Sequence, residues 1–168
     1  DGWSIERFNL TRPEMQFTSS GYWRYQTGKH ASNVEFKLRS SNFGQTALAL
    51  GVPEQLEGGE GEIRASLSWP GAPVAARATN VSGHLHVSAR NGRFLQLKQG
   101  AARLFGILDL SSIGRYLLLD FSPIFGAGFA YEKIQGDFDL DRGDATTRDL
   151  TVKGTSARIG LNGRVGLA

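Results

Sequence analysis

Hydrophobic and polar residues alternate one by one along much of this chain. Val34, Phe36 and Leu38, for example, are separated by charged residues. Successive side chains of a β-strand point to opposite faces, so the alternation predicts strands with one apolar and one solvated face. Strands buried on both faces would read as continuous apolar runs, and the pattern therefore indicates an antiparallel sheet. The stretches with this period are residues 33–40, 62–69, 81–89, 134–141 and 157–167.

Turn signals separate these stretches. Asn91-Gly92 predicts a hairpin after the stretch 81–89, because this pair accepts the positive φ angles of a tight turn. Residues 141–144 and 153–155 are further predicted turns, and the prolines of Trp69-Pro-Gly-Ala-Pro73 end a strand. Asn162-Gly163 lies inside the last alternating stretch, where a hairpin and an unbroken strand both remain open.

Two segments depart from the alternation and predict short helices. The first is 43–50, which Gly51 and Pro53 terminate, and the second is 100–110, which Gly106 weakens by about 1 kcal/mol relative to alanine. Residues 116–121 return to a strand pattern. The predicted fold class is all-β and mainly antiparallel, a curled or groove-forming sheet of some eight to ten strands with two short helices.

A loose internal repeat accompanies the strands. Residues 81–87 (VSGHLHV) and 134–140 (IQGDFDL) share an apolar residue, then glycine, then two alternating apolar residues. A hairpin unit stacked along one axis explains this similarity, and so does the general likeness of antiparallel strands.

Composition narrows the class of protein. The chain has 22 glycines and only 5 prolines among 168 residues, which favours frequent turns over a linker. It has no cysteine, which excludes disulfides and thiol catalysis. No stretch approaches ~18 apolar residues, and no signal peptide is present. The net charge of +3 is spread without long basic runs, so we expect no nucleic-acid partner.

The sequence holds no recognisable catalytic set. His84 and His86 share a strand face, and Asp137, Asp139 and Asp141 resemble part of a calcium loop. The alternation explains both groups as solvated strand faces, and neither has the remaining ligands that zinc or calcium requires. No nucleophile elbow or phosphate-binding loop occurs. We therefore expect no enzyme activity, no metal site and no cofactor.

Aromatic residues gather near the start of the chain. We expect them to form one end of the core, and a platform that faces sugar or lipid is the alternative. They are Trp3, Phe8, Phe17, Tyr22, Trp23 and Tyr25.

The second half of the chain contains three distinctive segments, 92–110 (GRFLQLKQGAARLFGILDL), 115–122 (RYLLLDFS) and 125–138 (FGAGFAYEKIQGDF), followed by a tail over 143–163. These segments closely resemble the YhdP-type members of the AsmA-like superfamily. The resemblance extends upstream to Gly21-Tyr-Trp and the Trp69 loop, nearly the whole chain. The departures are small: Pro123 stands where an acidic residue is usual, and Thr155-Ser156 replace Pro-Ala.

The resemblance implies a large protein anchored by one helix in the Gram-negative inner membrane. Its periplasmic body would be a long, curled antiparallel sheet with an apolar concave side, implicated in moving phospholipid between the inner and outer membranes. This chain, 1–168, would be a single segment near the C-terminal part of that body, with approximate halves 1–80 and 81–168. Its partners would be phospholipid acyl chains and possible envelope proteins, and membrane contact would occur only through other parts of the protein.

A sheet with one apolar face must cover that face, and two short helices are too little cover. Either the sheet closes onto a dry core, or it leaves a trough in which acyl chains lie. A closed β-sandwich that binds carbohydrate or protein and a structural spacer remain as alternatives. The candidate groove residues are Phe36, Leu38, Ile63, Leu67, Leu85, Val87, Phe138, Leu140, Val152, Ile159 and Leu161.

Overall fold

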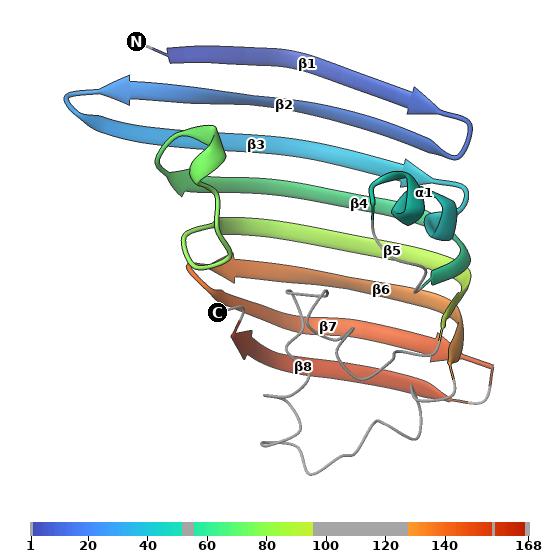
Figure 1. The fold of residues 1–168 in the computed structure, drawn as a ribbon. Coiled ribbons are helices and arrows are strands. Elements are labelled where there is room, and N and C mark those ends of the chain that lie inside the picture. Colours follow the sequence, from blue (N-terminus) through green and yellow to red (C-terminus); the bar gives the residue numbers. More distant parts are fainter. Residues whose placement is uncertain (1, 52–55, 96–127, 156, 167–168) are drawn as a thin grey trace.

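A computed structural model describes residues 2–51, 56–95, 128–155 and 157–166, and its strands form one sheet. Each strand pairs antiparallel with the next in the chain, so the eight-stranded sheet runs in sequence order from β1 to β8 (Figure 1). The sheet stays open, which confirms the predicted fold class. The strands are β1 (Gly2–Arg12), β2 (Met15–Gln26), β3 (Lys29–Ser40), β4 (Leu56–Pro70), β5 (Ser82–Phe94), β6 (Phe129–Asp141), β7 (Asp144–Gly154) and β8 (Arg158–Gly166).

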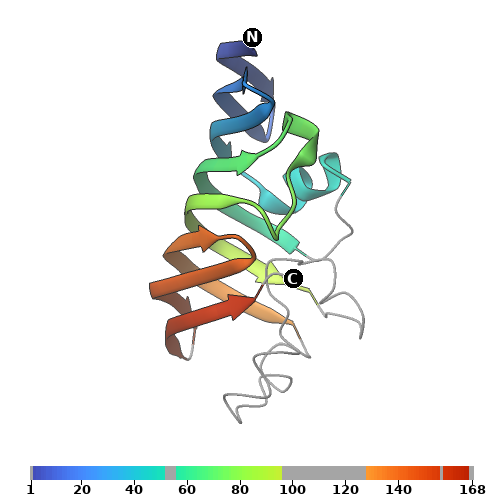
Figure 2. The same ribbon diagram turned by 90° about the vertical axis from the view of Figure 1, so that its left-hand side faces the viewer.

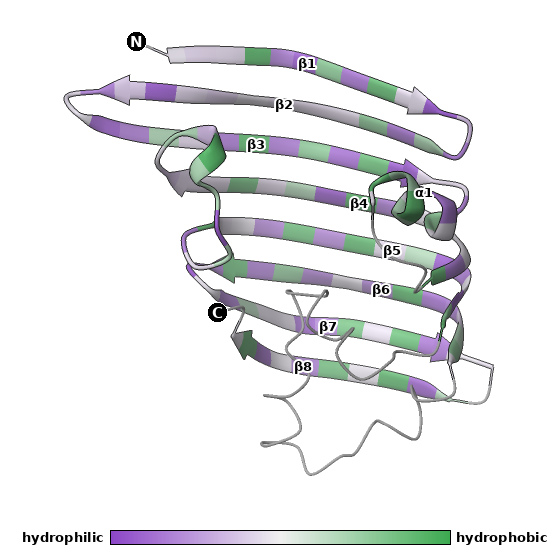
Figure 3. Cartoon of the chain, in the orientation of Figure 1, coloured by the Kyte–Doolittle hydropathy of each residue, from purple (hydrophilic) through white to green (hydrophobic). Residues whose placement is uncertain are grey.

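The predicted alternating stretches lie in β3, β4, β5, β6 and β8. Figure 3 shows hydrophobic and hydrophilic positions following one another along these strands. The alternation did not delimit β1, β2 and β7. In β2 the apolar face carries the small residues Ser19 and Gly21 between Phe17 and Trp23, which weakens the signal.

Bulges explain why β1 and β7 escaped the pattern. The register between β1 and β2 shifts between Ile5 and Phe8, and that between β7 and β8 shifts between Thr147 and Leu150. The register between β6 and β7 shifts at the same place, between Gln135 and Phe138 of β6. A bulge inserts one extra residue, so the side chains beyond it return to the same face despite an odd spacing. The strict two-residue period is lost in the sequence while the apolar face continues in the structure.

The predicted helix over 43–50 is confirmed as α1 (Phe43–Ala49). The side chain of Asn42 caps it by accepting a hydrogen bond from the Gln45 main-chain nitrogen at 3.0 Å. Gly51 follows with a φ of 79°, a conformation that favours glycine after a helix. The second predicted helix, 100–110, and the predicted strand 116–121 lie outside the described residues.

The turn predictions have mixed outcomes. Arg142 and Gly143 adopt positive φ angles of 45° and 103° in the turn between β6 and β7, and Gly154 ends β7, as expected. The hairpin expected at Asn91-Gly92 is wrong, because β5 continues through both residues to Phe94. Asn91 has a φ of 53°, but the strand keeps its register with β4 on both sides.

The glycine-rich segment opposite Asn91 shows what this irregularity accommodates. Gly58 and Gly59 on β4 also have positive φ angles, of 62° and 79°. A Cβ atom on Gly59 or Gly92 would lie 2.6 or 2.3 Å from the hydroxyl oxygen of Tyr131. The positive φ of Asn91 therefore serves a local change of strand direction beside the buried Tyr131 ring and does not reverse the chain.

The two repeat copies pair with each other. They lie on β5 and β6, and Leu85 is opposite Phe138. Because the strands are antiparallel, Gly83 faces Leu140 and Gly136 faces Val87, so each glycine meets the last apolar residue of the other copy. The last strand, β8, passes unbroken through Asn162-Gly163.

An ion cluster joins β3 to β4 on the polar face. Glu62 accepts hydrogen bonds from Arg39 at 2.8 Å and from Arg64, and it pairs with Lys37 at 3.1 Å. Partial burial raises the pKa of Glu62, but the hydrogen bonds from Arg39, Lys37 and Arg64 outweigh it and lower the pKa from 4.5 to about 2.

We predict that Glu62→Gln lowers the free energy of unfolding at neutral pH by about 1 kcal/mol. Because the folded-state pKa is depressed, the contribution of Glu62 is present above about pH 4.5 and disappears as the pH falls towards 2. Denaturant unfolding across this pH range measures the effect. Glu35→Gln, on the same face of β3 without an ion pair among the described residues, is the control. Equal losses for both variants would contradict the cluster's role.

We also predict that Gly83→Ala destabilises the sheet by about 1–3 kcal/mol. Gly83 has a φ of 146°, and a Cβ atom there would lie 2.0 Å from the carbonyl oxygen of Ser66 on β4. Gly160→Ala on β8 is the control, since nothing lies within 4 Å of its Cβ position. Thermal unfolding of both variants tests this, and a neutral Gly83→Ala would show that the backbone relaxes freely there.

Candidate functional site

The candidate groove residues all project from one face of the sheet. Residues directly opposite each other in an antiparallel sheet point to the same side. Leu38, Ile63 and Val87 form one such row across β3, β4 and β5. Leu85 and Phe138 belong to the next row, which also contains Phe36. The remaining candidates follow the same alternation, with Leu67 on β4, Leu140 on β6, Val152 on β7 and both Ile159 and Leu161 on β8.

These side chains are partly exposed to solvent. All the candidates are half-buried except Leu161, which is 36% exposed. The buried hydrophobic residues of the described part are few and mostly small: Met15, Ala65, Ala89, Tyr131 and Ala145. The large aliphatic and aromatic side chains of this face therefore retain contact with solvent in the described structure.

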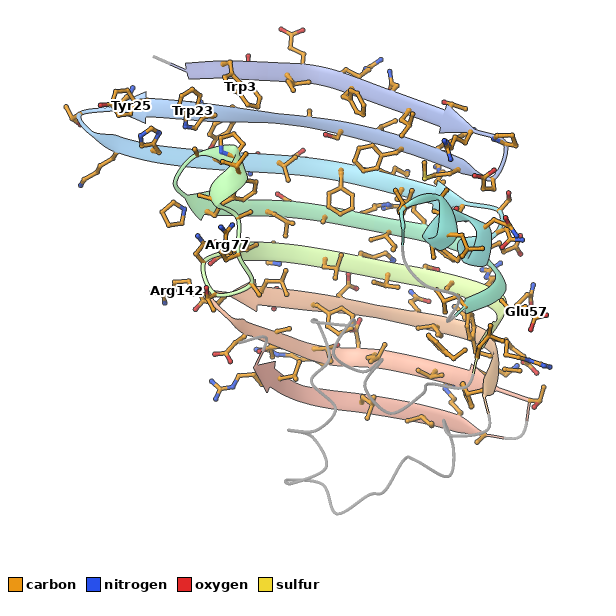
Figure 4. The ribbon with its side chains drawn as sticks, viewed as in Figure 1. Trp3, Trp23, Tyr25, Glu57, Arg77 and Arg142 are labelled. Atoms are coloured by element: carbon orange, nitrogen blue, oxygen red, sulfur yellow. The ribbon has the colours of Figure 1, made fainter. Side chains whose placement is uncertain are left out.

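Sequence reasoning missed the part of this face that β1 and β2 supply. Phe8, Phe17 and Phe36 form a row of rings, with centroids 6.2 and 5.7 Å apart. Trp3 and Trp23 pair at 6.5 Å near the far end of the same strands, close to Tyr25 (Figure 4). Because the bulge in β1 hides the alternation, only the clustering of aromatic residues in the sequence signalled this surface.

The sequence led us to expect that the first aromatic residues form one end of the core. For the aromatic residues of β1 this expectation is wrong. Trp3 is 46% exposed and Phe8 is 49% exposed. Ile5 and Leu10 on the same strand are exposed as well. The edge strand thus extends the apolar face outwards without burying it.

Two short segments cover the ends of this face. Figures 1 and 2 show α1 and the 3₁₀ turn η1 (Pro73–Ala75) on the same side of the sheet, at opposite ends of the strands. At the α1 end, the buried hydroxyls of Ser40 and Thr46 are hydrogen-bonded at 2.9 Å. At the η1 end, Ser32 Oγ donates to the Gly71 carbonyl at 2.9 Å, and Trp69 Nε1 donates to the Ala72 carbonyl at 3.0 Å. The apolar side chains between α1 and η1 form a strip that runs across the strands, from one strand to the next.

The opposite face is polar and carries a shallow hollow of about 840 Å³ across β1 to β6. Its polar lining includes Lys37, Arg64 and His86. Phe36, Leu85 and Phe138 also border it, but their side chains project to the apolar face, so their main chain supplies the floor. This hollow was not anticipated from the sequence.

His84 and His86 lie on this polar face, as expected. His84 Nδ1 is 2.5 Å from Asp139 Oδ1, and His86 Nδ1 is 2.7 Å from Asp137 Oδ1. The four side chains form two separate cross-strand pairs between β5 and β6. Among the described residues no group of three or more His, Cys, Asp or Glu side chains is arranged to hold a metal ion.

Asp141, the third aspartate of the calcium-loop-like stretch, lies at the turn between β6 and β7. Arg142 donates to Asp141 Oδ1 at 3.0 Å, and this hydrogen bond with the Arg142 charge lowers the pKa of Asp141. Asp149, in the β7 bulge, accepts a hydrogen bond from the Asp137 main-chain nitrogen at 2.9 Å. These carboxylates stabilise strand ends and a bulge, which is an ordinary structural use.

Comparison with curated proteins and with solved structures gave no significant match. Within the described residues, no helix is both long and hydrophobic enough to cross a lipid bilayer.

One comparison with protein families was positive, and it covers the whole chain. The family described as YhdP protein matches residues 1–168. This is a lipid-transport-related family of the bacterial envelope and not a known enzyme family, and the open eight-stranded sheet agrees with it. With an apolar face that continues across every strand and a family match from end to end, the chain belongs to the YhdP family of AsmA-like proteins.

Proposed function

We propose that this chain is a non-catalytic lipid-conduit segment, whose apolar face holds phospholipid acyl chains during their passage between the inner and outer membranes. The observation that carries the proposal is the half-exposed state of the large apolar side chains between α1 and η1. Contact with water raises the free energy of such a face, and contact with hydrocarbon lowers it.

Continuity across the strands supports a path and not a single pocket. The rows of apolar residues run from Leu10 on β1 through Phe17 and Leu38 to Val87 on β5. Each methylene group of an acyl chain that leaves water on such a surface contributes about 0.8 kcal/mol. Because neighbouring strands offer similar side chains, an acyl chain can shift from one strand to the next without crossing a polar row.

The alternative of a closed β-sandwich does not fit the structure. The described strands belong to one open sheet in sequence order, whereas a sandwich packs two sheets face to face. A structural spacer remains as the second candidate, since an open sheet also spans distance. The half-exposed apolar side chains of the inner strands favour the lipid role, because a spacer gains nothing from Phe36 or Leu85 in contact with water.

The cellular setting of the proposal follows from the family. The chain would be one segment of a longer body in the periplasm of a Gram-negative cell, held by an anchor in the inner membrane. In that setting the lipid head groups would stay at the open side of the sheet, near polar strand ends. The partners are then phospholipids and possible further envelope proteins.

We predict that phospholipid co-purifies with the chain and that a fluorescent acyl probe binds it. Leu85→Asp should weaken probe binding at least tenfold, because the charge lies in the row shared with Phe138 on the apolar face. Ser66→Asp adds the same charge to the polar face of β4 and should leave binding unchanged. Mass spectrometry of extracted lipid and probe titration measure these effects.

Whether Leu85→Asp remains folded distinguishes an accessible apolar surface from a sealed core. Leu85 is half-buried, so Leu85→Asp should retain strand circular dichroism and cooperative unfolding. Global unfolding of this variant would show that the face is a sealed core. A folded Leu85→Asp that binds the probe like the unaltered chain would also contradict the proposal.

A further inference from the structure

Four basic residues form a row across the polar face of β5 to β8. Arg90 lies opposite Lys133, Lys133 opposite Lys153, and Lys153 opposite Arg158. Each is next in sequence to an apolar-face residue, so all four point to the polar side. All four are exposed. With strands ~4.8 Å apart, this basic row spans ~14 Å.

Such a row is costly, because like charges directly opposite each other are destabilising. Elsewhere on the same face, some basic side chains meet carboxylates. Lys37 pairs with Glu62 at 3.1 Å, and Arg164 pairs with Asp144 at 3.4 Å. Ion pairs with carboxylates thus neutralise cations at other positions of this face, whereas most cations of the basic row lack such a pair among the described residues.

Lys153 of the basic row pairs with the carboxylate of Glu132 at 2.5 Å. Across the part of the chain that the structure describes, Arg90, Lys133 and Arg158 make no ion pair. Glu60 lies opposite Arg90 on β4, but its carboxylate accepts a hydrogen bond from Asn91 at 3.4 Å instead. Strands β5, β6 and β8 therefore each present a cation without a carboxylate partner among the described residues.

We propose that the basic row binds the phosphate head groups of an anionic phospholipid surface. Neighbouring cations ~4.8 Å apart are close enough to flank one phosphate, whose oxygens accept charge-assisted hydrogen bonds from both. Arg90 with Lys133 makes one such pair, and Arg158 presents a further cation two strands, ~9.6 Å, from Lys133. Separate phosphates on an open surface suit this spacing, and basic residues near such a surface favour binding additively.

Charge is distributed unevenly along these strands, which gives the contact an orientation. The basic row lies near the end where β7 turns into β8, while Asp139, Asp141 and Asp144 lie towards the other end. The basic end is therefore attracted more strongly to an anionic surface than the other end, where Arg142 and Arg164 pair with Asp141 and Asp144. The contact is on the opposite face from the acyl-chain path, so this inference goes beyond the proposed function and does not require it.

The test is co-sedimentation of the chain with vesicles at low ionic strength. Vesicles of equal parts phosphatidylglycerol and phosphatidylcholine should bind the chain, and pure phosphatidylcholine should bind it much less. Arg90→Gln with Lys133→Gln should weaken the first interaction about 30-fold. The control, Arg12→Gln with Lys29→Gln, removes the same charge from exposed positions on other strands and should change binding less than threefold.

Each alternative has its own outcome. Equal weakening by the two double variants would show unspecific attraction by net charge and overturn the proposal. Displacement of the vesicles by millimolar inorganic phosphate would show a site for free phosphate and also overturn it. The Arg90 and Lys133 variant should keep or raise its thermal midpoint, because it removes repulsion, and a fall would mean that the row is structural. Leu85→Asp should bind the anionic vesicles normally even if the acyl-chain proposal fails.

Discussion

The structure depends on one constraint, the antiparallel pairing in sequence order that keeps the apolar side chains of eight strands on a common face. A slip of one residue in any strand would send its apolar side chains to the polar side. The bulges in β1 and β7 return the apolar side chains to the common face where the two-residue spacing of the sequence is interrupted. The apolar face and the ordered charges of the other face are two consequences of the same register.

Most of the fold was predictable from the sequence because the two-residue period is a local signal. Leu38, Ile63 and Val87 were placed on one face before any pairing was known, and the register puts them side by side. The period failed where a bulge or small residues interrupted it, as in β1 and β2. The hairpin at Asn91-Gly92 failed for a different reason: positive φ angles serve a bend as well as a turn, and only the neighbouring Tyr131 decides between them.

The apolar face was predictable in its members but not in its exposure. Alternation says which side chains share a face, whereas the cover over that face comes from segments distant in sequence. The helix α1 and the turn η1 occupy only the two ends of the strands, so the residues between them stay half-exposed. The basic row could not be predicted from the sequence either, because Arg90, Lys133 and Arg158 are far apart in the chain. They come together only through the strand pairings β5–β6, β6–β7 and β7–β8. Long-range pairing, and not composition, creates both surfaces.

The central claim is that hydrocarbon lies against the apolar face. A phospholipid with a photoactivatable group at the end of its acyl chain tests this claim directly, with cross-linked residues located by mass spectrometry. The account predicts adducts on apolar-face side chains such as Phe36, Leu85 and Phe138, and none on their polar-face neighbours Lys37 and His84. Adducts confined to the polar face, or a protein that yields no adduct at all, would contradict it.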